Sequence, residues 1–343
     1  MKARYLSSLK KQKGVALIVV LLLLALMTAV AAQMSERLFV HFHRAENQVN
    51  HQQAYWYSLG VEALAKVAIE QSLEDSKTVN LNQAWATEEQ AYPLDYGEAI
   101  GSVYDRQACF NINALSAIKA NPDVSQRPFL VQFWQRLLEE EGVDNYLTEV
   151  IADSSWEYVD PNTQTGSMMG VEDSTYESYQ PAYLPPNAWL ADSSEIRAIN
   201  GVSGEIFDKI KPYVCALPTS DWYLNVNTLT VDQAPILVAL FSPSLALSNA
   251  KAILEDRPYD GWATVNDFLA ESAISAIDKT VKDKAKAYLA IDSQYFELDA
   301  QIFVEPSRVR VRALLYSKDK KEVTVVRRRY GGISERVSDN KVQ

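Results

Sequence analysis

The sequence predicts an α+β fold. A long N-terminal helix, first transmembrane and then amphipathic, packs on a small antiparallel sheet, and a large α-helical domain is inserted between the strands. Three observations predict this arrangement: an apolar segment from Val15 to Ala32, a helical pattern that continues without proline to about Leu73, and strand patterns on both sides of a helical region.

The apolar segment predicts a membrane anchor, because roughly 20 apolar residues are needed to cross a bilayer. The residues before it are basic and include no Asp or Glu; they are Lys2, Arg4, Lys10, Lys11 and Lys13. Positive flanks stay in the cytoplasm, so the bulk of the chain is expected outside it. The chain is therefore predicted to cross a membrane once, with its soluble part on the far side from the cytoplasm.

Two kinds of processing are compatible with this segment. A secretory signal would be cut after the apolar core, where Ala29, Ala31 and Ala32 supply small residues. The abrupt junction of Lys13-Gly14 with Val15 instead resembles a type IV prepilin signal, which is cut after the glycine so that the helix stays on the mature protein. The long helix that follows favours the second interpretation.

The helix is predicted to continue far beyond the membrane. Gly60 is the only glycine and there is no proline between Val15 and Tyr92. Apolar residues recur at spacings of three and four past the membrane, among them Leu38, Phe42, Val49, Trp56 and Val67. At 1.5 Å per residue, a helix ending near Leu73 is on the order of 90 Å long.

Strand patterns flank a long helical region. Two strands are expected at Asp95–Ile100 and Val103–Asn113, with a turn at Gly101-Ser102 between them. Three more are expected at the C-terminal end, at Tyr295–Val304, Arg308–Tyr316 and Val323–Tyr330. The arginines that alternate with Val309 and Val311, and the run from Arg327 to Arg329, are expected to face solvent.

The inserted region contains several short predicted helices and two notable patterns. The helices are expected at Phe129–Glu141, Glu195–Ile199, Ile206–Ile210, Pro235–Phe241 and Ser248–Leu254. Asn111-Ile112-Asn113 and Asn225-Val226-Asn227 both precede helices, where asparagine caps helix starts. Glu195 to Ile210 resembles a helix-hairpin-helix with its turn at Gly201 and Gly204, used structurally because its flanks are acidic.

Charge, cysteine content and the absence of catalytic motifs limit the range of possible functions. The net charge is −11, and removal of the five-cation leader makes it −16, which argues against nucleic acid as a partner. The two cysteines, Cys109 and Cys215, are expected to form a disulfide in an oxidising compartment, with two buried thiols as the alternative. The histidines lack the spacing of a helical zinc pair, and no catalytic motif is found, so no catalytic residue is predicted.

An acidic loop is the one candidate ligand site. Between Leu137 and Ser194 there are twelve carboxylates and neither Lys nor Arg. The loop begins with Asp160-Pro161-Asn162 and closes with Glu172-Asp173, which suits an irregular calcium cage, although Val171 stands where an EF-hand has its Glu. The predicted ligands are Asp160, Asn162, Glu172 and Asp173, with Thr165 as a possible carbonyl ligand. The alternative is a solvated acidic loop.

Taken together, these motifs resemble those of the K-type minor pseudopilins of the bacterial type II secretion system. The resemblance rests on the Gly14 junction, Cys109 to Leu115, Trp156 to Tyr176, Ser194 to Arg197 with Gly201, and Arg257-Pro258-Tyr259. It covers nearly the whole chain. Its Trp156-Glu157-Tyr158-Val159-Asp160 segment departs from the family's Trp-x-Asp start, which leaves the coordination open.

The resemblance implies a structural role. It implies a pilin-like α/β domain with a helical insertion, calcium in the acidic loop, and a place at the pseudopilus tip that helps initiate assembly for export of folded proteins. Implied partners are the I-, J- and H-type minor pseudopilins, the major pseudopilin, the inner-membrane assembly platform and a prepilin peptidase that cuts between Gly14 and Val15 before methylation. Rival interpretations are a minor pilin of a type IV pilus and a membrane-anchored periplasmic enzyme.

The resemblance also implies a division of the chain and one unusual residue. The expected parts are a leader at 1–14, a transmembrane half-helix at 15–34, a pilin-like domain at 35–113 and 291–332, an inserted helical domain at 114–290, and a tail at 333–343. In pilin-like subunits the fifth mature residue is a buried Glu that pairs with a neighbour's N-terminal amine; here it is Val19. The absence of a carboxylate there fits a subunit that enters the assembly first.

Overall fold

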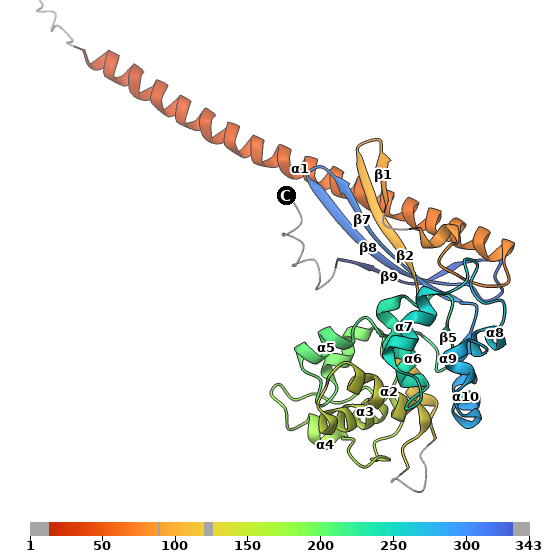
Figure 1. Cartoon of the computed structure of the whole chain (residues 1–343). Helices are drawn as coiled ribbons and strands as arrows, with labels where there is room; N and C mark the ends of the chain where they lie inside the picture. The colour runs from red at the N-terminus through yellow and green to blue at the C-terminus, as the bar shows by residue number, and fades with distance from the viewer. Residues whose placement is uncertain (1–13, 88–89, 120–125, 332–343) are drawn as a thin grey trace, which may run out of the picture.

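A single helix, α1 (Val15–Asp75), forms the stem of the molecule (Figure 1). The computed structural model describes residues 14–87, 90–119 and 126–331. Gly14 precedes the helix with a φ of 75°, and Ser76 ends it in an extended conformation. The predicted end near Leu73 is therefore correct to within two residues. The helix is long and apolar enough to cross a membrane, and its apolar N-terminal half lies outside the folded body.

The C-terminal half of α1 covers one face of a five-stranded antiparallel sheet with the strand order β1-β2-β7-β8-β9. The strands are β1 (Gln90–Leu94), β2 (Gly97–Asp105), β7 (Tyr295–Val304), β8 (Ser307–Tyr316) and β9 (Thr324–Tyr330). Ala65 and Ile69 of α1 share a core with Val311 and Leu315 of β8. The three C-terminal strands lie where the sequence predicts them.

The predicted turn at Gly101-Ser102 is wrong. The hairpin instead turns at Asp95-Tyr96, and Gly101 lies inside β2, opposite Gln90 on one side and Ala300 on the other. A Cβ on Gly101 would lie 2.7 Å from the Ala300 Cβ, so the glycine permits close strand approach and does not form a turn.

The helical insertion between β2 and β7 has a hydrophobic core of its own. Its helices are η2 (Ile112–Ala117), α2 (Phe129–Glu140), α3 (Asn145–Val159), α4 (Asp173–Tyr176), η3 (Ser193–Ala198), α5 (Gly204–Ile210), η4 (Val231–Gln233), α6 (Ala234–Leu240), α7 (Leu247–Glu255), α8 (Val265–Leu269), α9 (Ser272–Ser275) and α10 (Lys279–Lys286). Figure 1 shows this inserted domain at the end of the molecule farthest from the N-terminal half of α1.

Both Asn-x-Asn patterns lie at short parallel strand pairs within the insertion. Phe110–Asn111 (β3) pairs with Val214–Cys215 (β4), and Leu224–Asn225 (β5) pairs with Leu289–Ala290 (β6). Asn111 does accept a bond from the Asn113 backbone N–H, as expected of a cap. The asparagines are also fully buried and bond to distant loops, which a cap does not require.

The expected helix-hairpin-helix has a different first element. Ser193–Ala198 is a 3₁₀ helix, η3, followed by a turn in which Gly201 has a φ of 86°, and then by α5. The capping box of Asp192 and Glu195 begins η3.

The arginines of β8 and β9 are not simply solvent-facing, as the sequence led us to expect. Arg310 forms an ion pair with Asp299 of β7, and Arg328 with Glu62 of α1. Strand register places Asp299 diagonally across from Arg310, and the packing of α1 on the sheet places Glu62 beside Arg328. The alternation within one strand indicates neither partner.

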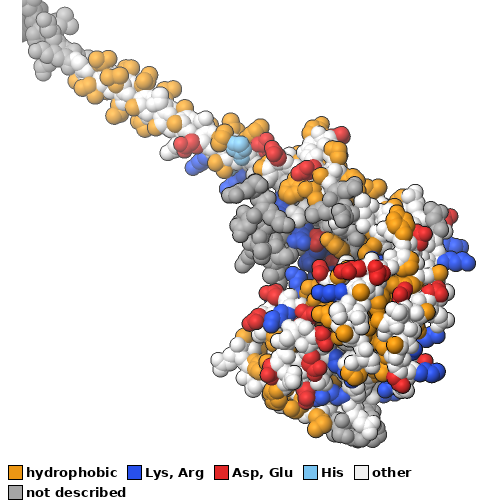
Figure 2. Space-filling model, in the orientation of Figure 1, with side chains coloured by type: hydrophobic (Ala, Val, Ile, Leu, Met, Phe, Trp, Pro, Cys, Tyr) orange, Lys and Arg blue, Asp and Glu red, His pale blue; other side chains and the backbone are white. Residues whose placement is uncertain are grey.

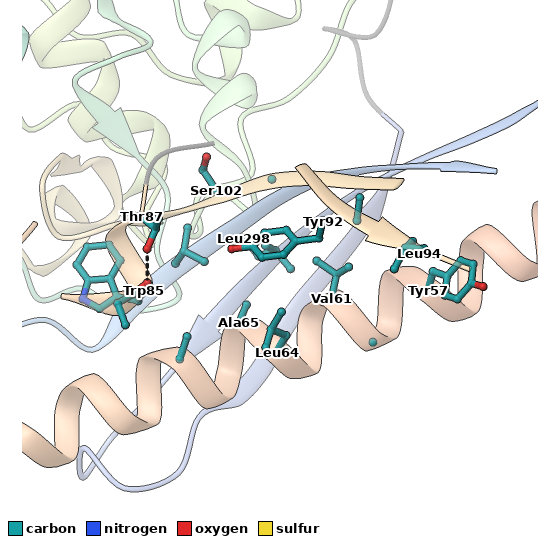
Figure 3. Close-up of a pocket in the computed structure, with 16 residues that line it drawn as sticks. Tyr57, Val61, Leu64, Ala65, Trp85, Thr87, Tyr92, Leu94, Ser102 and Leu298 are labelled. Atoms are coloured by element: carbon teal, nitrogen blue, oxygen red, sulfur yellow. Dashed lines mark hydrogen bonds between the residues drawn. The ribbon is translucent and has the colours of Figure 1, made fainter. Parts of the chain in front are cut away.

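An apolar groove of about 250 Å³ lies between α1 and the β1–β2 hairpin (Figure 3). Val61 and Leu64 of α1 face Tyr92 across it, and Trp85 of the short helix η1 (Ala84–Ala86) lies at one end. The hairpin therefore stands away from the helix at this edge of the sheet.

Candidate metal centre

Three carboxylates converge at the C-terminal end of α3. One oxygen from each of Glu157, Asp160 and Glu172 lies within 4.8 Å of the others, and all three side chains are buried. Glu157 lies in the last turn of α3, Asp160 is the residue that ends it, and Glu172 immediately precedes α4. The loop between the two helices folds back so that its two ends meet.

The loop is held by the same helix that supplies the carboxylates. Glu157 Oε1 accepts bonds from the Gly166 N–H (2.8 Å) and the Ser167 hydroxyl (2.5 Å). One turn earlier, Asp153 Oδ2 accepts a bond from the Met169 N–H at 3.0 Å. Arg127 donates to both oxygens of Asp153. The charge of Asp153 is thus compensated, and this residue positions the loop.

Gly170 is required where the loop crosses α3. A Cβ at this position would lie 2.3 Å from the Ser167 hydroxyl oxygen and 2.6 Å from the Glu157 Cγ. The Gly170 N–H also donates to the Ser167 hydroxyl at 3.1 Å. The backbone therefore approaches Glu157 more closely than any side chain allows.

The electrostatics of the three carboxylates are unfavourable without a cation. Glu157 Oε2 and both oxygens of Glu172 are buried and have no hydrogen-bond partner in the described part of the chain. Burial, together with the charges of Glu157 and Asp160, raises the pKa of Glu172 to about 7. Burial is also the main cause that raises the pKa of Glu157 and of Asp160. Buried carboxylate oxygens without donors are the ligands that a hard divalent cation requires, so these residues fit calcium.

The structure places the predicted ligands unequally. Asp160 and Glu172 belong to the group of three. Asn162 lies beside it, exposed, and donates from its side chain to Asp160 Oδ2 at 2.6 Å. Thr165 is exposed, and Asp173 is half-buried and lies outside the group.

Sequence reasoning missed Glu157. The signal that points to it is spacing, because residues three apart at a helix end lie on the same side, which places Glu157 beside Asp160. The sequence pattern does not predict helix α3, because buried polar residues interrupt its apolar periodicity.

The remaining predicted sites are also located. Cys109 and Cys215 form the expected disulfide. Gly14 and Val15 lie at the start of α1, and Val19 is in its exposed apolar half.

Comparisons with known proteins agree with this architecture. Two profiles described as "Type II secretion system (T2SS), protein K" match residues 108–219 and 224–292. The type II secretion system protein K of Aeromonas hydrophila is 35% identical, covering 95% of this chain and 99% of its own length. The chain belongs to the type II secretion system protein K family. The Klebsiella pneumoniae protein K is 34% identical over 94% of this chain and 97% of its own.

A solved member of the family has the same fold. A chain of the GspK-GspI-GspJ complex from enterotoxigenic Escherichia coli is 36% identical, with a TM-score of 0.77, and the match covers 84% of this chain and 99% of that one. The α+β fold with a helical domain is therefore a property that the chain shares with a solved protein K structure.

Proposed function

We propose that this chain caps the type II pseudopilus as its K-type minor pseudopilin and helps to initiate its assembly. Family membership and the likeness to a chain solved in a GspK-GspI-GspJ complex carry this proposal. The I- and J-type minor pseudopilins are the first partners. The same role implies four further partners: the H-type pseudopilin, the major pseudopilin, the assembly platform and the prepilin peptidase. The role is structural and requires no catalysis.

The position of the inserted domain supports capping. In a pilus-like fibre, subunits stack along their stem helices, and here the insertion projects at the end of the sheet away from the membrane segment (Figure 1). A further subunit stacked above would have to occupy the same space as this domain. Subunits that add below meet only the stem and the sheet.

The location follows from the stem. The exposed apolar half of α1 spans the inner membrane once and leaves the soluble domains, with limits near residues 114 and 290, in the periplasm. Cleavage after Gly14 leaves Val15 as the N-terminus. A carboxylate inside the membrane is costly unless it is paired with the amine of an earlier subunit. The first subunit of an assembly has no earlier subunit, and Val19 fits that position because it carries no charge.

Calcium binding by the acidic loop completes the proposal. Glu157, Asp160 and Glu172 are the residues that would hold the ion, and it would supply positive charge among carboxylates that otherwise repel. The support is the set of buried carboxylate oxygens without donors. A bound ion would fix the loop against α3.

The test is complementation of a strain whose type II secretion system is intact except for its own protein K. The full-length chain is expected to restore secretion, to co-purify with the I- and J-type pseudopilins, and to have an N-terminal mass beginning at Val15. An uncut chain that starts at Met1 would favour a membrane-anchored enzyme. A chain that starts after Ala32 would show that the apolar segment is a cleaved secretory signal. A Val19→Glu variant that initiates assembly normally would assign tip position to the insertion alone.

A further inference from the structure

The face of the sheet opposite α1 carries a concentration of arginines. Successive side chains of a strand point to opposite faces. Val311 packs toward α1, so Arg310 and Arg312 point away from it. Arg329 of β9 is the direct cross-strand neighbour of Arg312 and shares its face. Like charges directly opposite each other destabilise a sheet. Asp299 of β7 lies opposite Arg312 on its other side, but it forms its ion pair with Arg310.

The inserted domain supplies the other wall of a cleft of about 960 Å³ over these strands. Helix η3 contributes Arg197, whose guanidinium lies 5.5 Å from the centre of the Phe207 ring of α5. Five cationic and three acidic side chains line the cleft; they are Arg106, Arg197, Lys211, Arg312, Arg329, Asp192, Asp208 and Glu297. In a chain of net charge −11 this is a local reversal of sign. Figure 2 shows Lys and Arg side chains on this side, between the stem and the inserted domain.

The acidic groups of the cleft do not compensate all of its cations. Asp192 pairs with Arg329, and Glu297 pairs with Arg106. The Nε of Arg312 is buried and has no hydrogen-bond partner among the residues that the structure describes. A buried donor without an acceptor is costly, and that cost is removed when an acceptor enters.

A neighbouring arginine, Arg327, is influenced by the charges of the cleft. Burial and the charge of Arg329 lower the pKa of Arg327, which lies beside the cleft on β9. Asp192 and Glu297 act in the opposite direction and raise that pKa, so Arg327 is surrounded by charges of both signs.

We propose that this arginine cleft binds an acidic peptide segment of a partner protein, whose carboxylates pair with Arg312 on the sheet and Arg197 on the inserted domain. A guanidinium fork matches a carboxylate in two parallel hydrogen bonds. A cleft of several hundred Å³ accepts a few residues of extended chain. An occupant that contacts both domains also fixes their relative position. This partner surface goes beyond capping and calcium binding, neither of which uses the cleft.

The distribution of charge selects a peptide over other anions. The cationic side chains of the cleft belong to two domains, so a single phosphate group can contact only some of them. Asp192 and Glu297 are already ion-paired, but Asp208 forms no ion pair among the described residues and repels a continuous polyanion such as nucleic acid. A peptide with spaced carboxylates can place an uncharged residue beside Asp208.

The experiment uses the full-length chain in detergent micelles and a fluorescein-labelled peptide of alternating Glu and Gly. Anisotropy titration at low ionic strength is expected to show saturable binding that weakens with salt, and no binding of the same peptide with Gln in place of Glu. Arg312→Gln and Arg197→Gln are each expected to weaken binding roughly tenfold, the effect of one charged hydrogen-bonded pair. Lys251→Gln removes an exposed cation on α7 outside the cleft and is expected to leave binding unchanged.

Several outcomes would overturn the proposal. These are equal binding of the Gln peptide, equal weakening by Lys251→Gln, or displacement of the peptide by inorganic phosphate at the same concentration. Arg197 is exposed, so its variant is expected to fold even if Arg312→Gln does not. Unchanged binding by a folded Arg197→Gln variant would also refute the assignment.

Discussion

Arg329, on the last strand of the sheet, lies with its Nη1 2.5 Å from the Oδ2 of Asp192 in the inserted domain. Asp192 also begins η3, because its side chain accepts a bond from the Ser194 N–H. Burial raises the pKa of Asp192, but the bonds from Ser194 and Arg329 outweigh burial and lower that pKa to about 2. One carboxylate therefore caps a helix and joins the two domains by charge.

We expect this contact to make the domain junction sensitive to acid. The folded-state pKa of Asp192 is below its ordinary value of 3.8. Its contribution to the free energy of unfolding is therefore present above pH ~4 and is lost as the pH falls toward ~2; the shift corresponds to about 2 kcal/mol. Asp192→Asn keeps a capping oxygen but removes the charge. The variant should be less stable than wild type at pH 7, and this difference should shrink below pH ~4 in urea unfolding curves. A difference independent of pH would show that the charge is not responsible.

The sequence predicts those elements whose cause is local. The stem helix follows from its apolar periodicity, and β7 to β9 follow from alternation, since each pattern reports one buried face. The turn placed at Gly101 fails because glycine also serves close strand approach, and only the position of Ala300 decides between the two uses.

The features that could not be predicted from the sequence depend on residues that are distant in the chain. Asn227 was interpreted as a cap, but its side chain exchanges two hydrogen bonds with the backbone of Trp262. In the candidate metal centre, Asp160 and Glu172 were found because the loop composition marks them. Glu157 belongs to a helix whose buried polar residues hide its periodicity, so only the fold brings it to the site.

The disulfide is expected to contribute much of the stability of the junction. Cys109 and Cys215 pack with Leu314 of β8, and 106 residues separate them in sequence. Closing a loop of ~100 residues stabilises by up to ~4.7 kcal/mol in the chain-entropy model, and typical measured values are about 2–4 kcal/mol. The double variant with serine at both positions should lose about 2–4 kcal/mol in urea unfolding. Reductant should destabilise wild type and leave the variant unaffected; an unchanged unfolding midpoint in the variant would contradict the role.

Calcium is expected to stabilise the folded chain through Glu172. At a hundredfold excess over the Kd, a ligand of the folded state adds about 2.7 kcal/mol, so the melting temperature should fall when a chelator is added. Glu172→Gln should abolish this difference. Without calcium at pH 8 the same variant should be at least as stable as wild type, because it removes one of three mutually repelling charges. Glu177→Gln, an exposed change nearby, should keep the calcium response. Identical melting curves with calcium and chelator in wild type would mean that the loop binds no calcium.

The last prediction separates the shape of the loop from its charge. Gly170→Ala changes no charge, but its Cβ would lie 2.3 Å from the Ser167 hydroxyl oxygen, 2.6 Å from the Glu157 Cγ and 3.1 Å from the Asp153 carbonyl oxygen. The loop must move away from α3, so the calcium-dependent rise in melting temperature should be lost or strongly reduced. Stability without calcium should fall by about 1–3 kcal/mol, as in other overpacked sites. Gly204→Ala provides the matched control, since nothing lies within 4 Å of a Cβ there and the residue begins α5. It should leave calcium binding intact and leave stability unchanged or slightly raised. If Gly170→Ala binds calcium as wild type does, measured by isothermal titration, the contact between the loop and Glu157 is not needed to form the site.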